Sequence, residues 1–94
     1  MATGFIQKPL NVSVSSAAWT AVTLGADQSA KDFAVQARAA NNFKMSDTSA
    51  GTKYFTVKSG TAISFEDVNA PKGSTLFYAQ SSAAADVLEV VITR

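Results

Sequence analysis

Apolar residues that alternate with polar ones are the feature that most limits what this chain can fold into. In the segment from Lys53 to Asp67, which reads KYFTVKSGTAISFED, two such alternating runs flank Ser59 and Gly60. A period of two places successive side chains on opposite faces of a strand. Gly60 can adopt the positive φ that a tight turn requires. The segment therefore predicts two strands that pair as a hairpin.

The same alternation recurs along most of the chain. It predicts eight short strands without a helix or a repeat, at residues 10–15, 19–24, 32–40, 42–47, 54–58, 62–66, 74–80 and 87–93. In the last of these strands, Leu88, Val90 and Ile92 are the expected inward set. The pattern is typical of an all-β fold, namely a single-domain, eight-stranded antiparallel β-sandwich or jelly roll over residues 10–94.

Residues 27–40 are less clear, because their sequence also favours a helix. The run DQSAKDFAVQARAA contains good helix formers, with Asp27 or Ser29 as a possible N-cap and Asn41, which follows the run, as a possible C-cap. Against a helix, Phe33 and Val35 belong to an alternating run that a strand would bury on one face. We predict a strand over residues 32–40 that pairs with the next strand, at residues 42–47.

The first nine residues have no periodicity and predict a short extended N-terminal arm. Residues 1–9 contain two neighbouring apolar residues, Phe5 and Ile6, and end at Pro9. Arms of this kind either cover the sheet of their own domain or dock on a neighbouring subunit. For an assembly interface, Phe5, Ile6, Pro9 and the single tryptophan, Trp19, are the candidate residues.

The composition excludes most hydrolase sites. The chain has no histidine and no cysteine, so the commonest general base, the commonest catalytic metal ligand, the thiol nucleophile and disulfides are all absent. A carboxylate pair and an oxygen-only calcium site near Asp67 and Asn69 stay chemically open, although loop aspartates more often form turns. We expect no enzyme activity, no cofactor and no metal.

Charge and hydropathy limit the partners. The net charge is +1 and the basic residues are scattered, which argues against a nucleic-acid partner. No run approaches the roughly 20 apolar residues of a membrane span, and no secretory signal is present, so we expect a cytosolic chain without a membrane partner. Charged residues make up only 16%, whereas Ala, Ser and Thr supply 37 of 94 residues. Small side chains lose little entropy on contact, which suits a subunit of a large assembly.

Five runs carry a resemblance to a known group of proteins: WxxVxL at 19–24, FxVQ at 33–36, GTKYFTVKSG at 51–60, STLFYAQSS at 74–82 and VLEVV at 87–91. They resemble the small virion structural proteins of tailed bacteriophages, of the capsid decoration (cement) type. The resemblance implies a non-enzymatic homo-oligomer, typically a trimer, that binds the major capsid protein or another virion protein and decorates or stabilises the capsid. It implies location in the virion, and in the host cytoplasm during assembly. It implies no active-site residues.

Two alternatives stay open at this point. A tail or connector structural subunit would show the same sequence features. A carbohydrate-binding β-sandwich module would use Trp19, Tyr54 and Tyr78 as a stacking platform, which requires at least two of these rings to be exposed and roughly coplanar.

Overall fold

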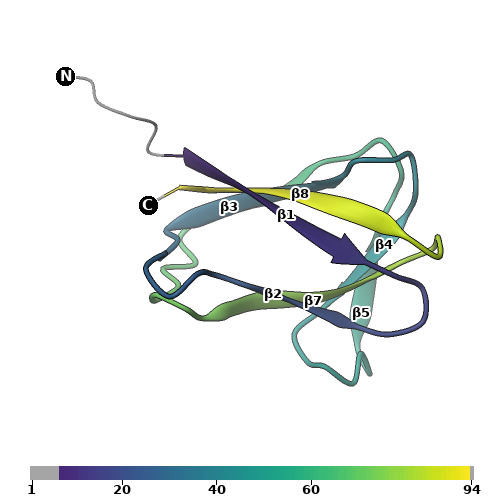
Figure 1. Cartoon of the computed structure of the whole chain (residues 1–94), viewed down its shortest axis with the longest axis horizontal. Helices are drawn as coiled ribbons and strands as arrows, with labels where there is room; N and C mark the ends of the chain where they lie inside the picture. Colours follow the sequence, from purple (N-terminus) through teal and green to yellow (C-terminus); the bar gives the residue numbers. More distant parts are fainter. Residues whose placement is uncertain (1–6, 94) are drawn as a thin grey trace.

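The computed structural model describes the backbone of residues 7–93 and the side chains of residues 9–93. In this range the chain forms eight strands in two antiparallel sheets (Figure 1). The strands are β1 Gln7–Val14, β2 Thr20–Thr23, β3 Asp32–Ala37, β4 Phe43–Ser46, β5 Tyr54–Val57, β6 Ile63–Phe65, β7 Thr75–Ser81 and β8 Asp86–Thr93. The predicted all-β fold of eight strands is confirmed. Over the described residues, the structure contains no helix that could cross a bilayer.

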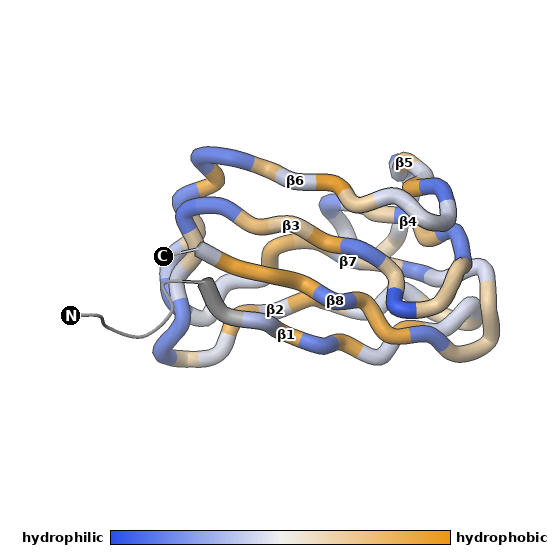
Figure 2. The backbone as a smooth tube through the Cα atoms, turned by 90° about the horizontal axis from the view of Figure 1, so that it is seen from above, coloured by the Kyte–Doolittle hydropathy of each residue, from blue (hydrophilic) through white to orange (hydrophobic). Residues whose placement is uncertain are grey.

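The order of the strands identifies the type of sandwich. Sheet A has the order β1-β8-β3-β6, and sheet B has the order β2-β7-β4-β5. Figure 2 shows the strands of sheet A side by side in this order. Six of the seven connections cross between the sheets, and only β4 and β5 are consecutive strands that are also neighbours. This winding is that of a jelly roll, one of the two architectures that the sequence predicted.

The core lies between the two sheets. On β8, Leu88, Val90 and Ile92 are fully buried, as predicted. The Phe33 ring of sheet A stacks on the Phe77 ring of sheet B, with centroids 5.5 Å apart. The other buried apolar residues are Val14, Val22, Leu24, Ala30, Val35, Phe43, Met45, Val57 and Ala79. Each large apolar side chain among them stabilises the fold by about 1.5–3 kcal/mol.

The predicted hairpin between Lys53 and Asp67 is wrong, although both of its strands are present. β5 pairs with β4 in sheet B, whereas β6 pairs with β3 in sheet A. The turn itself exists, because the Thr61 N–H donates to the Lys58 carbonyl at 3.2 Å and Gly60 has a φ of 78°. Positive φ at the third residue alone defines a type II turn, which does not match the twist of a two-residue hairpin. The chain instead crosses to the other sheet.

The predicted strand at residues 32–40 is confirmed over Asp32–Ala37, but its predicted pairing with β4 is wrong. β3 lies between β8 and β6, and β4 lies between β7 and β5. The connection from β3 to β4 is fastened by the buried Asp86 carboxylate. It accepts hydrogen bonds from the N–H groups of Ala39 and Val87 at 3.3 and 2.7 Å, and from the Asn41 amide at 3.2 Å. These bonds hold the crossing between the sheets.

β1 begins within the predicted arm. Gln7 pairs with Thr93 and Pro9 pairs with Val91, so residues 7–9 belong to sheet A. A proline is tolerated there because β1 is an edge strand. The rest of the arm, including Phe5 and Ile6, lies outside the described residues.

Candidate functional site

The acidic side chains do not form a chemical site in the described part of the chain. Within it, no group of three or more Asp or Glu residues is placed to hold a metal ion. Asp67 and Asn69 have left-handed φ values of 57° and 48°, and the Asn69 amide donates to the Asp67 carbonyl at 3.2 Å. They shape the turn after β6, which is a common role of loop Asp and Asn residues. The functional candidates are therefore surfaces.

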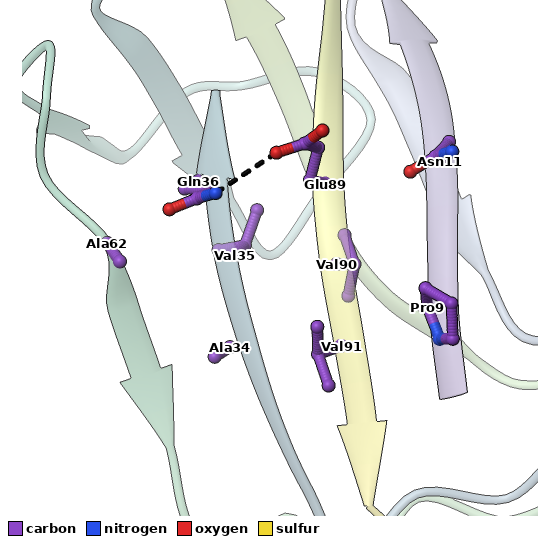
Figure 3. Close-up of a pocket in the computed structure, with 9 residues that line it drawn as sticks. All are labelled: Pro9, Asn11, Ala34, Val35, Gln36, Ala62, Glu89, Val90 and Val91. Atoms are coloured by element: carbon purple, nitrogen blue, oxygen red, sulfur yellow. Dashed lines mark hydrogen bonds between the residues drawn. The ribbon is translucent and has the colours of Figure 1, made fainter. Parts of the chain in front are cut away.

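The outer face of sheet A carries a shallow hollow of about 470 Å³ that extends over β1, β8 and β3 as far as Ala62, which precedes β6 (Figure 3). Outward-facing small side chains form an apolar row along it. Pro9 on β1 pairs with Val91 on β8, and Val91 also pairs with Ala34 on β3. Ala62, just before β6, adds a fourth small apolar side chain to the lining. We call these four residues the apolar row. Contact with them would immobilise few rotamers.

A polar row lies beside the apolar row. Gln36 Nε2 donates to Glu89 Oε1, and Arg38 Nε donates to Glu89 Oε2, both at 3.0 Å; Figure 3 shows the first of these bonds. The hydrogen bond from Gln36, followed by that from Arg38, lowers the pKa of the Glu89 carboxyl. Asn11 lies opposite Glu89 on β1. We call Asn11, Gln36, Arg38 and Glu89 the polar row. Hydrogen bonds within the chain hold three of them, Gln36, Arg38 and Glu89, in place.

Part of the outer face of sheet B is covered by a cluster around Trp19. Trp19 is half-buried against Gly51, where an added Cβ would overlap the indole ring. The centroids of the Trp19 and Tyr54 rings are 5.9 Å apart. The Nζ atom of Lys44 lies 4.7 Å from the centre of the Tyr54 ring, a cation–π geometry. We call these four residues the Trp19 cluster.

The structure separates the residues that the sequence singled out for an interface. Pro9 is exposed and lines the hollow on sheet A. Trp19 instead packs within its own cluster over the other sheet. The rings of Trp19 and Tyr54 are inclined at 48°, and Tyr78 is half-buried. These rings do not form the coplanar platform that carbohydrate stacking requires.

Sequence reasoning missed the open side of the sandwich, where β5 and β6 form the margins of their sheets. Phe55 on β5 is 45% exposed, and its ring centroid lies 6.4 Å from that of Phe65 on β6. Tyr54, on the opposite face of β5, is 51% exposed. Alternation groups Phe55 with the buried Val57. It does not reveal that Phe55 lies on an edge strand, because the position of a strand in its sheet depends on the order of all the strands.

Comparisons with known proteins add one weak likeness. No protein-family model and no curated protein matches the chain. Among solved structures, a Bacillus endospore appendage, described as one of a novel family of disulfide-linked pili, is similar over 99% of this chain and 94% of that chain. The two sequences are 19% identical and the TM-score is 0.36. A likeness at this TM-score carries no argument about function.

Proposed function

We propose that this chain is a non-enzymatic structural protein of a tailed bacteriophage, which self-associates and binds the assembled capsid to decorate and stabilise it. The observation that carries the proposal is the outer face of sheet A, with its apolar row and hollow. The resemblance of five sequence runs to small virion proteins supports the assignment to a tailed bacteriophage.

The outer face of sheet A has the properties of a surface that binds another rigid protein. Interface cores are depleted of Lys and Glu, and the small side chains of the apolar row let a partner approach the sheet closely. A hollow of about 470 Å³ can receive an anchoring side chain, and such anchors dominate binding energy. The polar row provides a rim whose geometry is fixed before contact.

The mechanism is thermodynamic. A protein that binds only the assembled shell stabilises it by mass action, by about 2.7 kcal/mol per site when the free concentration is 100 times Kd. A stable contact usually buries on the order of 1,600 Å², which is more than a single row of side chains can supply. In this proposal Phe5 and Ile6, which precede β1 in the sequence, extend the contact begun by Pro9.

Co-sedimentation with purified particles tests the proposal. Val91→Glu places a charge in the apolar row, and Val68→Glu is its matched control, because the two valines are 36% and 37% exposed. We expect Val91→Glu to weaken binding to phage heads by about tenfold or more, since it buries an unpaired carboxylate. We expect Val68→Glu to bind like the unmodified chain.

Three outcomes would contradict the proposal. The unmodified chain could fail to sediment with heads at any concentration, or both variants could bind equally well. Binding to isolated tails or connectors but not to heads would assign the chain to that layer of the virion instead.

A further inference from the structure

β1 is the longest and most regular of the four edge strands. It ends sheet A on the side opposite β6, and Figure 2 shows it along that margin of the molecule. It has eight residues in continuous register with β8. β2 and β5 have four residues and β6 has three, and the register of β2 shifts between Val22 and Thr23. Within residues 7–93, no strand pairs with β1 on its outer side. Such an edge is a template for pairing with another chain.

The side chains of β1 do not oppose a partner strand. No residue from Pro9 to Val14 is charged, whereas charged residues flank both β5 and β6. Charges and bulges are the usual means by which an edge strand resists pairing. Leu10 and Val12 pack against the core but are only partly buried. Their remaining apolar surface is available for a neighbouring strand to cover.

The hydrogen bonds of β8 show which main-chain groups of β1 are free. The Val87 carbonyl accepts from the Arg38 N–H at 2.8 Å, so the odd-numbered residues of β8 direct their main-chain groups toward β3. The even-numbered residues of β8 therefore face β1, where they lie opposite even-numbered residues. The odd-numbered residues of β1 thus direct their main-chain groups outward; these are Gln7, Pro9, Asn11 and Ser13. Proline is tolerated at an edge in this orientation, since its missing N–H faces outward.

We propose that two copies of this chain pair edge to edge through β1, antiparallel, with Leu10 of each copy opposite Leu10 of the other across a two-fold axis. Gln7 of each copy then exchanges two main-chain hydrogen bonds with Ser13 of the other. The Asn11 N–H donates to the Pro9 carbonyl of the other copy. The two A sheets become one continuous sheet. This pairing rests on the self-association in the proposed function and names the surface that performs it.

The register follows from the free groups of β1. A pair centred on Pro9 would set two carbonyls against each other without a donor. A pair centred on Asn11 or Val12 would leave Gln7 without a strand residue opposite it, because β1 ends at Val14. The register centred on Leu10 therefore makes the most main-chain bonds. It also places the two Leu10 side chains in a non-hydrogen-bonded pair, where side chains approach each other most closely.

The pairing brings both binding faces to the same side. The two-fold axis of an antiparallel strand pair is perpendicular to the sheet, so the outer faces of the two A sheets point in one direction. Because Pro9 lies opposite Asn11 of the other copy, the apolar row of each copy continues into the polar row of the other. One strand pair buries less than about 1,200 Å², so we expect a weak dimer in solution. Two linked faces would bind a shell more tightly than one.

Sedimentation velocity over a concentration series, from about 10 μM to about 1 mM, tests the pairing with two substitutions at one position. Ser13→Pro removes an N–H that is free within one copy and places a ring where the other strand must lie. We expect a monomer–dimer equilibrium for the unmodified chain and a dimer Kd raised at least tenfold by Ser13→Pro. Ser13→Ala keeps the N–H and should leave Kd unchanged. Thermal unfolding shows whether both variants are folded.

Amide hydrogen exchange of the unmodified chain, followed by NMR, tests the register without a substitution. The N–H groups of Leu10 and Val12 face β8, so they should be protected at every concentration. The N–H groups of Asn11 and Ser13 face outward. Their exchange should slow as the concentration rises, by the factor by which the monomer fraction falls.

Four results would overturn the pairing: a monomer at every concentration, a trimer, a dimer that a folded Ser13→Pro variant forms equally well, or a dimer in which the Asn11 and Ser13 amides exchange as fast as in the monomer. A dimer with the expected amide protection that ignores phage heads would refute the decoration role and leave this pairing in place. A monomer that binds heads would refute the pairing and leave the decoration role in place.

Discussion

The outer faces of the two sheets differ in the side chains that lie on them. On sheet B, Trp19 packs against Gly51 and Tyr54 over part of the strands. On sheet A, the described residues leave a hollow lined by small side chains. Both sheets have four strands and share one core, so the difference does not arise from the architecture. It arises from which residues face outward.

This difference indicates where a partner can bind. Packed aromatic side chains lie over part of sheet B, and a partner would have to displace the Trp19 cluster to reach the strands beneath it. A bare face of small side chains can be buried without ordering long side chains. The following predictions change one face at a time, from the largest expected effect to the smallest.

The largest effect is expected at Gly51, under the indole ring. Gly51 has a φ of 63°, and a Cβ there would overlap the Trp19 ring, so Gly51→Ala combines backbone strain with overpacking. We expect a loss of about 2–4 kcal/mol of unfolding free energy, measured by urea denaturation. Gly60→Ala is the control, because Gly60 has a φ of 78° but nothing within 4 Å of an added Cβ; about 1 kcal/mol should be lost there. Equal losses would contradict the described packing of Trp19.

Trp19→Ala removes the cover of sheet B itself. Because the side chain is half-buried, we expect a loss of about 2 kcal/mol, less than for a core tryptophan. In this background Gly51→Ala should cost no more than Gly60→Ala does, since only backbone strain is left. A double-mutant cycle that shows no coupling between positions 19 and 51 would refute the contact.

Val91→Glu on sheet A should have little effect on stability, although it should abolish most particle binding. Val91 faces outward and is partly exposed, so the free energy of unfolding should change by no more than about 1 kcal/mol. Chemical denaturation measures this change. A large loss would mean that the apolar row supports the fold, and the reduced binding would then say nothing about an interface.

The smallest effect concerns Glu89 in the polar row. Its pKa is lowered from the ordinary value of 4.5 by hydrogen bonds from Gln36 and Arg38. A carboxyl with a lower pKa in the folded state adds stability above its unfolded pKa, and this stability is lost as pH falls through the folded pKa. NMR titration should give a midpoint below 4.5 for Glu89, and Gln36→Ala should move it upward. A midpoint that does not respond would show that the hydrogen bond does not form in solution.

The sequence predicted the strands well because alternation is a local property. Leu88, Val90 and Ile92 are buried on one face as predicted. Residues Asp32–Ala37 form the predicted strand and not the alternative helix. Pairing is not local, since the alternation of β5 and β6 is satisfied equally by a hairpin and by a crossing to the other sheet. Gly60 predicted a turn but not its type.

The surfaces were less predictable for the same reason. Pro9 could be named as a candidate from its place at the end of the predicted arm, but its neighbour Val91, and Ala34 beyond it, come from distant strands. The packing of Trp19 within the chain could not be predicted, because the glycine that accommodates it lies in a remote loop.

Electron cryomicroscopy of phage particles with the chain bound would test the central claim most directly. The account predicts that the outer face of sheet A, with Pro9 and Val91, contacts the shell and that the Trp19 cluster faces away from it. Density that places the Trp19 cluster against the shell, or particles that carry no bound chain at saturating concentration, would contradict it.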